Sequence, residues 1–317
     1  MNNDILSRIG NTPLVRMDRV AASLSVPLFA KCEFLNPGGS VKDRIAKSII
    51  EDAESRGELQ SGATLIEATA GNTGIGLAIV AASRGYRLVC VLPEKMSIDK
   101  RIALAALGMK VVVVPNAPLG DPSNFRRAAE RMAAANDWYL TRQFEHPANP
   151  RIHEETTGPE ILEQCGGRVG AFVCGVGTGG TITGVGRYLK RHCPGVKIVM
   201  ADPVGSRLAH LVDPRWPDLD APFLVEGIGG SEPPKVLDLS VVDAAEVIAD
   251  DESFLMAGRL LREEGLLVGG SSGTAVAAAI RVAERGSIDG PIVVLLPDSW
   301  DRYYSQPWMK TLALRED

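Results

Sequence analysis

Short apolar runs alternate with longer amphipathic stretches along most of the chain. The clearest runs are rich in β-branched side chains and lie at residues 88–93, 110–115, 171–175, 197–202 and 291–298. Continuous apolar runs, rather than strict in-and-out alternation, are typical of strands buried on both faces of a sheet. The pattern therefore predicts an α/β fold, in which parallel sheets are covered by helices on both sides.

These runs fall into two groups, at about residues 60–145 and 168–300. A polar, proline-containing stretch, "QFEHPANPRIHEETTGPE" at 143–160, separates them. A chain of 317 residues has room for two domains, since domains commonly have about 150 residues each. We therefore expect two α/β domains with a cleft between them.

Composition and charge narrow the possible functions. The net charge is −5, and no Lys/Arg-rich run suggests a nucleic-acid or membrane-surface partner. Neither a signal peptide nor an apolar segment long enough to span a bilayer is visible, so we expect a cytoplasmic protein. The five cysteines are widely spaced, as in a reduced compartment. The four histidines are scattered and no metal-binding motif is present, so no metal is expected.

Four segments place clusters of Gly, Ser, Thr and Asn at the start of a predicted helix. They are "NPGGSVKDR" (36–44), "EATAGNTGIGLA" (67–78), "CGVGTGGTITGVG" (174–186) and "VGGSSGTAVAAA" (268–279). A helix start presents backbone N–H groups and the positive end of its dipole, and glycine lets an anion approach the main chain. Any one of them could be an ordinary capped helix start. Four together favour a role in ligand binding.

The third segment also permits a different interpretation. Residues 175–180, "GVGTGG", match the dinucleotide fingerprint G-x-G-x-x-G, and Asp202 ends the next predicted strand. A nicotinamide-dependent dehydrogenase is therefore an alternative. However, the fingerprint lies in the middle of the chain. The hydroxyl-rich turn at Gly179, Gly180 and Thr181 also suits a terminal phosphate better than a bridging pyrophosphate.

Lys42 follows the first of these turns, where it could simply be an exposed residue at a helix start. A cation is unfavourable there because it opposes the helix dipole. A phosphate cup, a lone lysine and further polar helix starts are, however, the parts needed to hold pyridoxal phosphate. In that interpretation the Lys42 amine forms a Schiff base with the cofactor's aldehyde.

With these motifs in order, the chain resembles the cysteine synthase and cystathionine β-synthase family of fold type II pyridoxal-phosphate enzymes. The resemblance extends from "IGNTPLVRM" (9–17) to "VVLLPDSWDRYYS" (293–305). It implies two three-layer α/β/α domains with mostly parallel sheets, as in the tryptophan synthase β chain, and an active site in the interdomain cleft. Residues 1–12 and 35–148 would form a smaller, mobile domain, and residues 13–34 and 149–317 a larger one. It also implies a homodimer, and we expect no regulatory module.

The resemblance assigns roles to particular residues. Lys42 becomes the Schiff-base lysine and general base, Asn72 the partner of the cofactor's 3′ oxygen, and Ser271 the partner of the pyridine nitrogen. The phosphate cup would consist of Gly177, Thr178, Gly179, Gly180 and Thr181. The substrate would be bound by Thr69, Ala70, Gly71, Asn72, Thr73 and Gln143, with Gly227 in a loop facing it.

The implied activity is β-replacement on serine or an O-activated serine such as O-acetylserine, through an α-aminoacrylate to which a thiol adds. A serine hydroxyl at the pyridine nitrogen makes the ring a weaker electron sink than an aspartate would, which favours elimination. The motifs "PEKMS", "DPVGS" and "EGIG" lean toward cystathionine β-synthase, with homocysteine as acceptor and cystathionine as product. Cysteine synthase, with sulfide as acceptor, remains the alternative. Ala70 stands at the position where the motif "TSGNTG" usually has serine. This difference leaves open which serine derivative is the substrate.

A non-catalytic binding protein on the same fold is a third class of function. The presence of Lys42, Asn72 and Ser271 together argues against it.

Overall fold

The computed structural model describes residues 4–69, 71–94, 96, 98–118 and 120–314. The chain divides into two compact units, Met1–Ile9 with Asn36–Asn149 and Gly10–Leu35 with Pro150–Asp317. Each unit contains a largely parallel sheet covered by helices, which confirms the predicted α/β fold class. The domain boundaries expected from the sequence lie one to three residues from these limits. Mobility of the smaller unit stays a prediction.

The first unit has a parallel sheet with the strand order β5-β4-β3-β6. Its strands are β3 (Thr64–Ala68), β4 (Arg87–Pro93), β5 (Lys110–Val114) and β6 (Tyr139–Leu140), and its helices are η1 (Ile5–Arg8), α1 (Lys42–Ser55), α2 (Asn72–Arg84), α3 (Ile98–Ala106) and α4 (Phe125–Asn136). Leu65 and Leu88 pack in a cluster with residues of α1 and α2, whereas Ile66 and Val89 pack with α4. Because both faces of the sheet are covered, its strands are continuous apolar runs.

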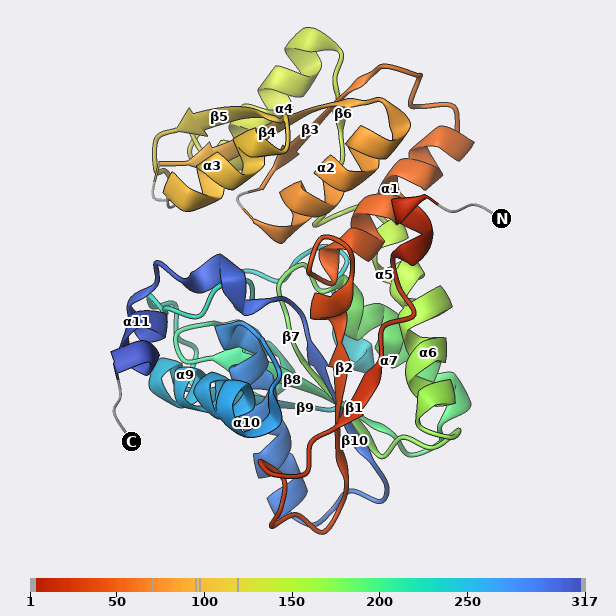
Figure 1. Ribbon diagram of the computed structural model, residues 1–317, viewed down its shortest axis with the longest axis vertical. Coiled ribbons are helices and arrows are strands. Elements are labelled where there is room, and N and C mark those ends of the chain that lie inside the picture. Colours follow the sequence, from red (N-terminus) through yellow and green to blue (C-terminus); the bar gives the residue numbers. More distant parts are fainter. Residues whose placement is uncertain (1–3, 70, 95, 97, 119, 315–317) are drawn as a thin grey trace. The chain divides into compact units, whose positions relative to one another are not determined.

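The second unit contains a sheet with the order β1-β2-β10-β7-β8-β9. Its strands are β1 (Leu14–Arg16), β2 (Leu28–Cys32), β7 (Ala171–Gly175), β8 (Lys197–Pro203), β9 (Ala244–Ile248) and β10 (Ile292–Leu296). Only the β1–β2 pair, of those described, is antiparallel. Strand β2 pairs with β10 from the other end of the chain, so that red and blue ribbons lie side by side in Figure 1.

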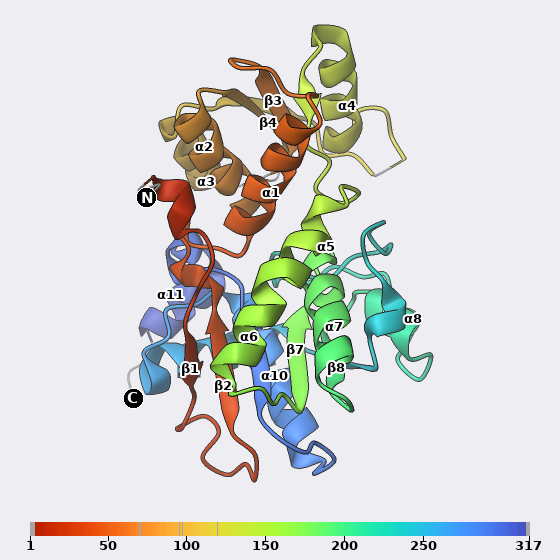
Figure 2. The same cartoon turned by 90° about the vertical axis from the view of Figure 1, so that its right-hand side faces the viewer.

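Helices cover both faces of this second sheet. Figure 2 shows α6 (Gly158–Gln164) and α7 (Gly180–His192) on one side of it and α10 (Gly270–Glu284) on the other, where α10 packs against α9 (Asp250–Arg259). The remaining helices are η2 (Glu33–Leu35), η3 (His153–Thr157), α8 (Leu208–Val212), η4 (Leu239–Val241), η5 (Leu260–Glu264), η6 (Trp300–Tyr303) and α11 (Pro307–Leu314), and α5 (Ala148–Ile152) spans the boundary between the units. Helices η3 and η5 are π-helices.

All five apolar runs singled out in the sequence are strands, namely β4, β5, β7, β8 and β10. Strand β2 was not predicted because it contains Lys31. The Lys31 side chain is fully buried, and its Nζ atom lies 2.6 Å from the Thr12 carbonyl oxygen and 2.7 Å from Glu160 Oε2. A lysine is acceptable in a buried strand only when such partners neutralise it, and these partners come from distant parts of the chain.

Candidate functional site

The predicted substrate loop lies at the carboxyl edge of the sheet in the first unit. Thr69, Gly71, Asn72 and Thr73 follow strand β3, and Gln143 follows the neighbouring strand β6. The Thr73 hydroxyl donates a hydrogen bond of 2.6 Å to Gln143 Oε1. The structure thus brings these predicted residues together, although they are about 70 positions apart in the sequence. Ala70 lies outside the described residues.

Helix α2 begins in this loop without a side-chain cap. Its N-cap residue is Gly71, which makes no side-chain cap hydrogen bond, and no acidic residue lies in the first turn. The first-turn N–H groups therefore have no partner within the helix, and the dipole favours a negative charge at this position. This arrangement suits a carboxylate ligand.

A buried carboxyl group that was not predicted supports the same loop. Glu67 Oε2 accepts hydrogen bonds from the Gln143 backbone N–H at 3.2 Å and from the Thr141 hydroxyl, and Oε1 accepts one from the Ala68 N–H at 3.0 Å. Burial raises the pKa of the Glu67 carboxyl. A lone acidic residue in the apolar run "TLIEA" was the only signal of it in the sequence.

Lys42 is the first residue of helix α1 and its side chain is half-buried. The preceding turn closes where the Gly38 N–H donates a hydrogen bond of 2.5 Å to Asp43 Oδ2. Helix α1 starts directly against α2. The two helices are so close that a Cβ atom at Gly76 would lie only 3.0 Å from the Lys42 carbonyl oxygen. Lys42 therefore belongs to the same unit as the substrate loop, on the helix adjacent to it (Figure 1).

The predicted phosphate cup lies in the second unit, where strand β7 leads into helix α7. A Cβ atom at Gly177 would lie 2.3 Å from the Gly227 carbonyl oxygen, and Gly179 has a φ of +86°. Both positions therefore require glycine. Helix α7 has no side-chain cap and no acidic residue in its first turn. This glycine-rich turn at a helix N-terminus fits a phosphate group.

Ser271 lies at the same edge of that sheet as the cup. It is a buried residue in the first turn of α10, which begins beside the carboxyl end of β10, because the Gly269 N–H donates to the Asp298 carbonyl oxygen at 3.2 Å. Strands β7 and β10 are parallel neighbours. Their carboxyl ends therefore bring Ser271 and the turn at Gly177 to one edge, the position at which open α/β sheets bind ligands. Residues that fit a phosphate and a ring nitrogen thus come from one unit.

A second residue that the sequence did not predict, His153, contacts the cup. Its Nε2 atom lies 3.2 Å from Thr181 Oγ1, and its side chain is 1% exposed. The sequence showed only four scattered histidines, because the contact joins residues 28 positions apart.

The structure weakens the dehydrogenase alternative. Asp202 would have to bind a ribose hydroxyl in that interpretation. Instead its side chain is fully buried, and its Oδ2 atom accepts a hydrogen bond of 2.8 Å from the Ala209 N–H. Burial raises the pKa of Asp202 to about 6. A carboxyl group enclosed in this way is not available to a nucleotide.

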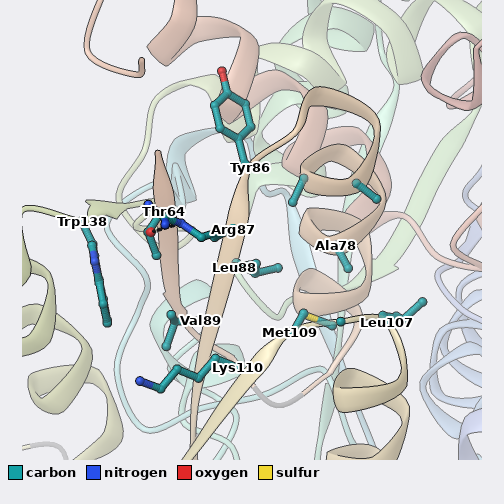
Figure 3. A pocket seen from close by; sticks show the side chains of 13 residues that line it. Thr64, Ala78, Tyr86, Arg87, Leu88, Val89, Leu107, Met109, Lys110 and Trp138 are labelled. Carbon is teal, nitrogen blue, oxygen red and sulfur yellow. Dashed lines mark hydrogen bonds between the residues drawn. The ribbon is translucent and has the colours of Figure 1, made fainter. Parts of the chain in front are cut away.

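A cavity of about 480 Å³ also lies in the first unit, at the opposite edge of its sheet. Figure 3 shows Thr64, Arg87 and Lys110, which begin strands β3, β4 and β5, among the residues that line it. The candidate residues follow the carboxyl ends of the strands. The cavity is therefore distinct from the candidate site.

Other site types find little support in the part of the chain that the structure describes. No group of three or more His, Cys, Asp or Glu side chains is placed to hold a metal ion. No helix within the described ranges is long and apolar enough to cross a membrane.

Fold and site together indicate an α/β protein with a glycine turn that fits the phosphate group of a cofactor. Residues 5–298 match the family described as pyridoxal-phosphate dependent enzyme. The chain therefore belongs to the pyridoxal-phosphate dependent enzymes, and pyridoxal phosphate is the family's cofactor.

Several curated proteins are similar to this chain. It is 47% identical to cystathionine β-synthase of Rattus norvegicus over 314 residues, which cover 96% of this chain and 56% of that protein. It is 43% identical to cystathionine β-synthase of Apis mellifera over 318 residues, covering 97% and 62%. The chain thus spans about three fifths of the length of these relatives.

Solved structures are similar as well. The crystal structure of O-ureido-L-serine synthase has a TM-score of 0.91 and 39% sequence identity, covering 100% of this chain and 98% of that one. A lysine-to-alanine mutant of the same enzyme with O-ureido-L-serine bound has a TM-score of 0.89 and 39% identity, covering 100% and 96%.

Proposed function

We propose that the protein catalyses β-replacement on serine or an O-activated serine, with homocysteine as the thiol acceptor and cystathionine as the product. The glycine turn that starts helix α7, with Ser271 at the same sheet edge, carries the cofactor assignment. The identity of 43–47% to cystathionine β-synthases favours this acceptor.

The residues present divide the work between binding and proton transfer. The turn from Gly177 to Thr181 would hold the cofactor's phosphate, and Ser271 would offer its ring nitrogen a neutral hydroxyl. Bound pyridoxal phosphate supplies an aldehyde for the substrate amine and a ring that withdraws electrons from the substrate's Cα. Lys42 Nζ would anchor the cofactor and then accept the proton from Cα.

Substrate orientation would be the task of the first unit. The uncapped start of α2 at Gly71 and Asn72 would receive the α-carboxylate through its backbone N–H groups. The hydrogen bond between Thr73 and Gln143 holds the side of this loop in place, and Glu67 supports Gln143 from the interior. This gives each amino-acid substrate a fixed direction before its Cα–H bond is broken.

The test begins with the purified full-length protein and pyridoxal phosphate. We expect a yellow protein whose visible absorbance disappears on borohydride reduction. The reduced cofactor should then be found covalently attached to Lys42. Serine, O-acetylserine and O-phosphoserine are then supplied in turn with homocysteine or sulfide, and the products are separated by chromatography. Cystathionine from serine and homocysteine supports the proposal. A protein that stays colourless with added cofactor contradicts it.

Replacing Lys42 by Ala should lower turnover by at least about a thousandfold, because one amine both anchors the cofactor and moves the proton. The matched control is Lys47→Ala, on the same helix, whose Nζ atom donates a hydrogen bond to the Leu6 carbonyl oxygen at 3.3 Å. This variant should retain wild-type turnover. Equal losses in both variants would show that the effect arises from folding of α1.

Two other products remain as alternatives. Cysteine formed with sulfide would indicate a cysteine synthase. Formation of O-ureido-L-serine is favoured by the TM-score of 0.91 to O-ureido-L-serine synthase. With hydroxyurea supplied as a third nucleophile, which is the source of the ureido group, the same chromatographic assay distinguishes the three products.

We further propose that the protein is a cytoplasmic homodimer. The dimer rests on the family resemblance, and the compartment on the five cysteines, none of which forms a disulfide and four of which are buried. Forward scattering that corresponds to one chain would contradict the dimer.

A further inference from the structure

His153 joins a hydroxyl group of the phosphate cup to a second, buried hydroxyl group. On one side its Nε2 atom lies 3.2 Å from Thr181 Oγ1. On the other, its Nδ1 atom lies 2.9 Å from Thr157 Oγ1. The side chain of Thr157 is fully buried, whereas that of Thr181 is half-buried. The imidazole ring therefore links the interior to a group that a ligand can reach.

The backbone holds the ring in this position. His153 is the first residue of the π-helix η3, and wide turns of this kind are frequent at functional sites. Helix α7 approaches it at Gly184, where a Cβ atom would lie 2.1 Å from the Pro150 carbonyl oxygen and 2.7 Å from His153 Cβ. Only glycine permits so close an approach between helix α7 and the turn that carries His153.

The direction of these hydrogen bonds decides what Thr181 offers to an anion. A hydroxyl group has one hydrogen, and a neutral imidazole has one N–H and one bare nitrogen. If Thr181 donates its hydrogen to Nε2, it presents only lone pairs to a phosphate. If Nε2–H donates to Thr181 Oγ1 instead, the hydroxyl hydrogen remains available to a phosphate oxygen. Thr157 then donates to Nδ1.

We propose that His153 is a positioning residue that holds the Thr181 hydroxyl hydrogen toward the cofactor's phosphate. The order of donation is Thr157 to Nδ1 and Nε2–H to Thr181, whose hydroxyl then donates to the phosphate. This inference rests on the proposed function, since the phosphate is that of pyridoxal phosphate. His153 itself touches neither substrate nor cofactor in this scheme.

The test compares two substitutions in the full-length holoprotein. His153→Gln retains an N–H donor near the position of Nε2, whereas His153→Leu removes it. A hydrogen bond to a charged group contributes enough that its loss should release the cofactor about tenfold faster in the leucine variant. The glutamine variant should remain close to wild type, and the ³¹P resonance of the bound phosphate should shift only in the leucine variant.

A second comparison separates positioning from packing. In a Thr181→Val background the hydroxyl is gone, so adding His153→Leu should not accelerate cofactor release further. His210→Leu serves as the control, because the ring of this half-buried histidine of the same unit lies 2.8 Å from the Trp216 carbonyl oxygen, away from the phosphate cup. It should leave release and the ³¹P resonance unchanged.

The outcomes are distinct. A wild-type protein with no visible band and no ³¹P signal would contradict the proposed function itself. If the protein binds the cofactor but His153→Leu and His153→Gln behave alike, or the losses with Thr181→Val simply add, the positioning role is wrong. ¹⁵N NMR of the ring decides the case independently of any variant. A hydrogen on Nε2 supports the proposal, and a neutral ring with its hydrogen on Nδ1 overturns it.

Discussion

Asp202 illustrates how a single buried group makes stability depend on pH. Its side chain is fully buried at the end of β8, and within the described residues its Oδ1 atom has no hydrogen-bond partner. Burial raises the pKa of its carboxyl group from 3.8 to about 6. The folded protein therefore holds this proton more tightly than the unfolded chain between about pH 4 and pH 6. Stability from this group is complete below that window and is lost as the pH rises through it.

Replacing Asp202 by Asn should remove this dependence, because asparagine stays neutral and keeps an oxygen for the Ala209 N–H. The variant should gain on the order of 3 kcal/mol relative to wild type as the pH is raised from 4 to 7. Urea unfolding at several pH values measures the difference in the free energy of unfolding between the two proteins. The contributions of the other titrating groups cancel in this difference. A difference that does not change with pH would contradict the prediction.

Individual site residues differ in how much of their role can be inferred from the sequence. Lys42 and Asn72 stand in local motifs, so their chemistry is visible from the residues beside them. Glu67 and His153 contact Gln143 and Thr181, which are 76 and 28 positions away. Without knowledge of these contacts, each is only an isolated polar residue.

Helix α7 depends on glycine at one position far more than at another two residues further on. A Cβ atom at Gly184 would lie 2.1 Å from a backbone oxygen, whereas at Gly186 the nearest atom is a methyl group of Val241 at 3.0 Å. Gly184→Ala should therefore destabilise the protein by about 1–3 kcal/mol.

The control for this substitution is Gly186→Ala. It should be close to neutral, because alanine favours the helix by about 1 kcal/mol and the Val241 side chain can adjust. Thermal unfolding of the two variants gives the comparison. Equal melting temperatures for the two variants would contradict the prediction, because they would mean that α7 and the π-helix η3 can move apart to admit a methyl group at position 184.

Strands differ in predictability for a similar reason. Strands β4, β5, β7, β8 and β10 are apolar runs whose burial on two faces is evident from composition alone. Strand β9, "AAEVI", contains Glu246, whose buried Oε2 atom accepts a hydrogen bond of 2.8 Å from Arg285 at the C-terminal end of α10. Such a strand becomes recognisable once its partner is known.

In the molecule as a whole, the predicted ligand groups are divided between the two units. The predicted substrate loop belongs to the first unit and the predicted phosphate cup to the second. An amino acid joined to the cofactor would bind groups of both units, so we expect substrate binding to draw them together.

Small-angle scattering of the holoprotein tests this closure. The radius of gyration should fall when a saturating amino-acid substrate is added. A Thr73→Val variant, which lacks the hydroxyl that bonds Gln143, should show a smaller fall at the same concentration. An unchanged radius of gyration in the wild-type protein with substrate bound would rule out closure.

The sequence by itself determined the α/β class, the positions of the main strands and the glycine-rich helix starts, because each depends on neighbouring residues and on local periodicity. Only the tertiary structure decided that Gln143 meets Thr73, that Glu67 contacts Gln143, that His153 contacts Thr181, and that Asp202 is enclosed. Those features depend on contacts between residues far apart in the chain, and the free energy of burying a polar group depends on which partners reach it.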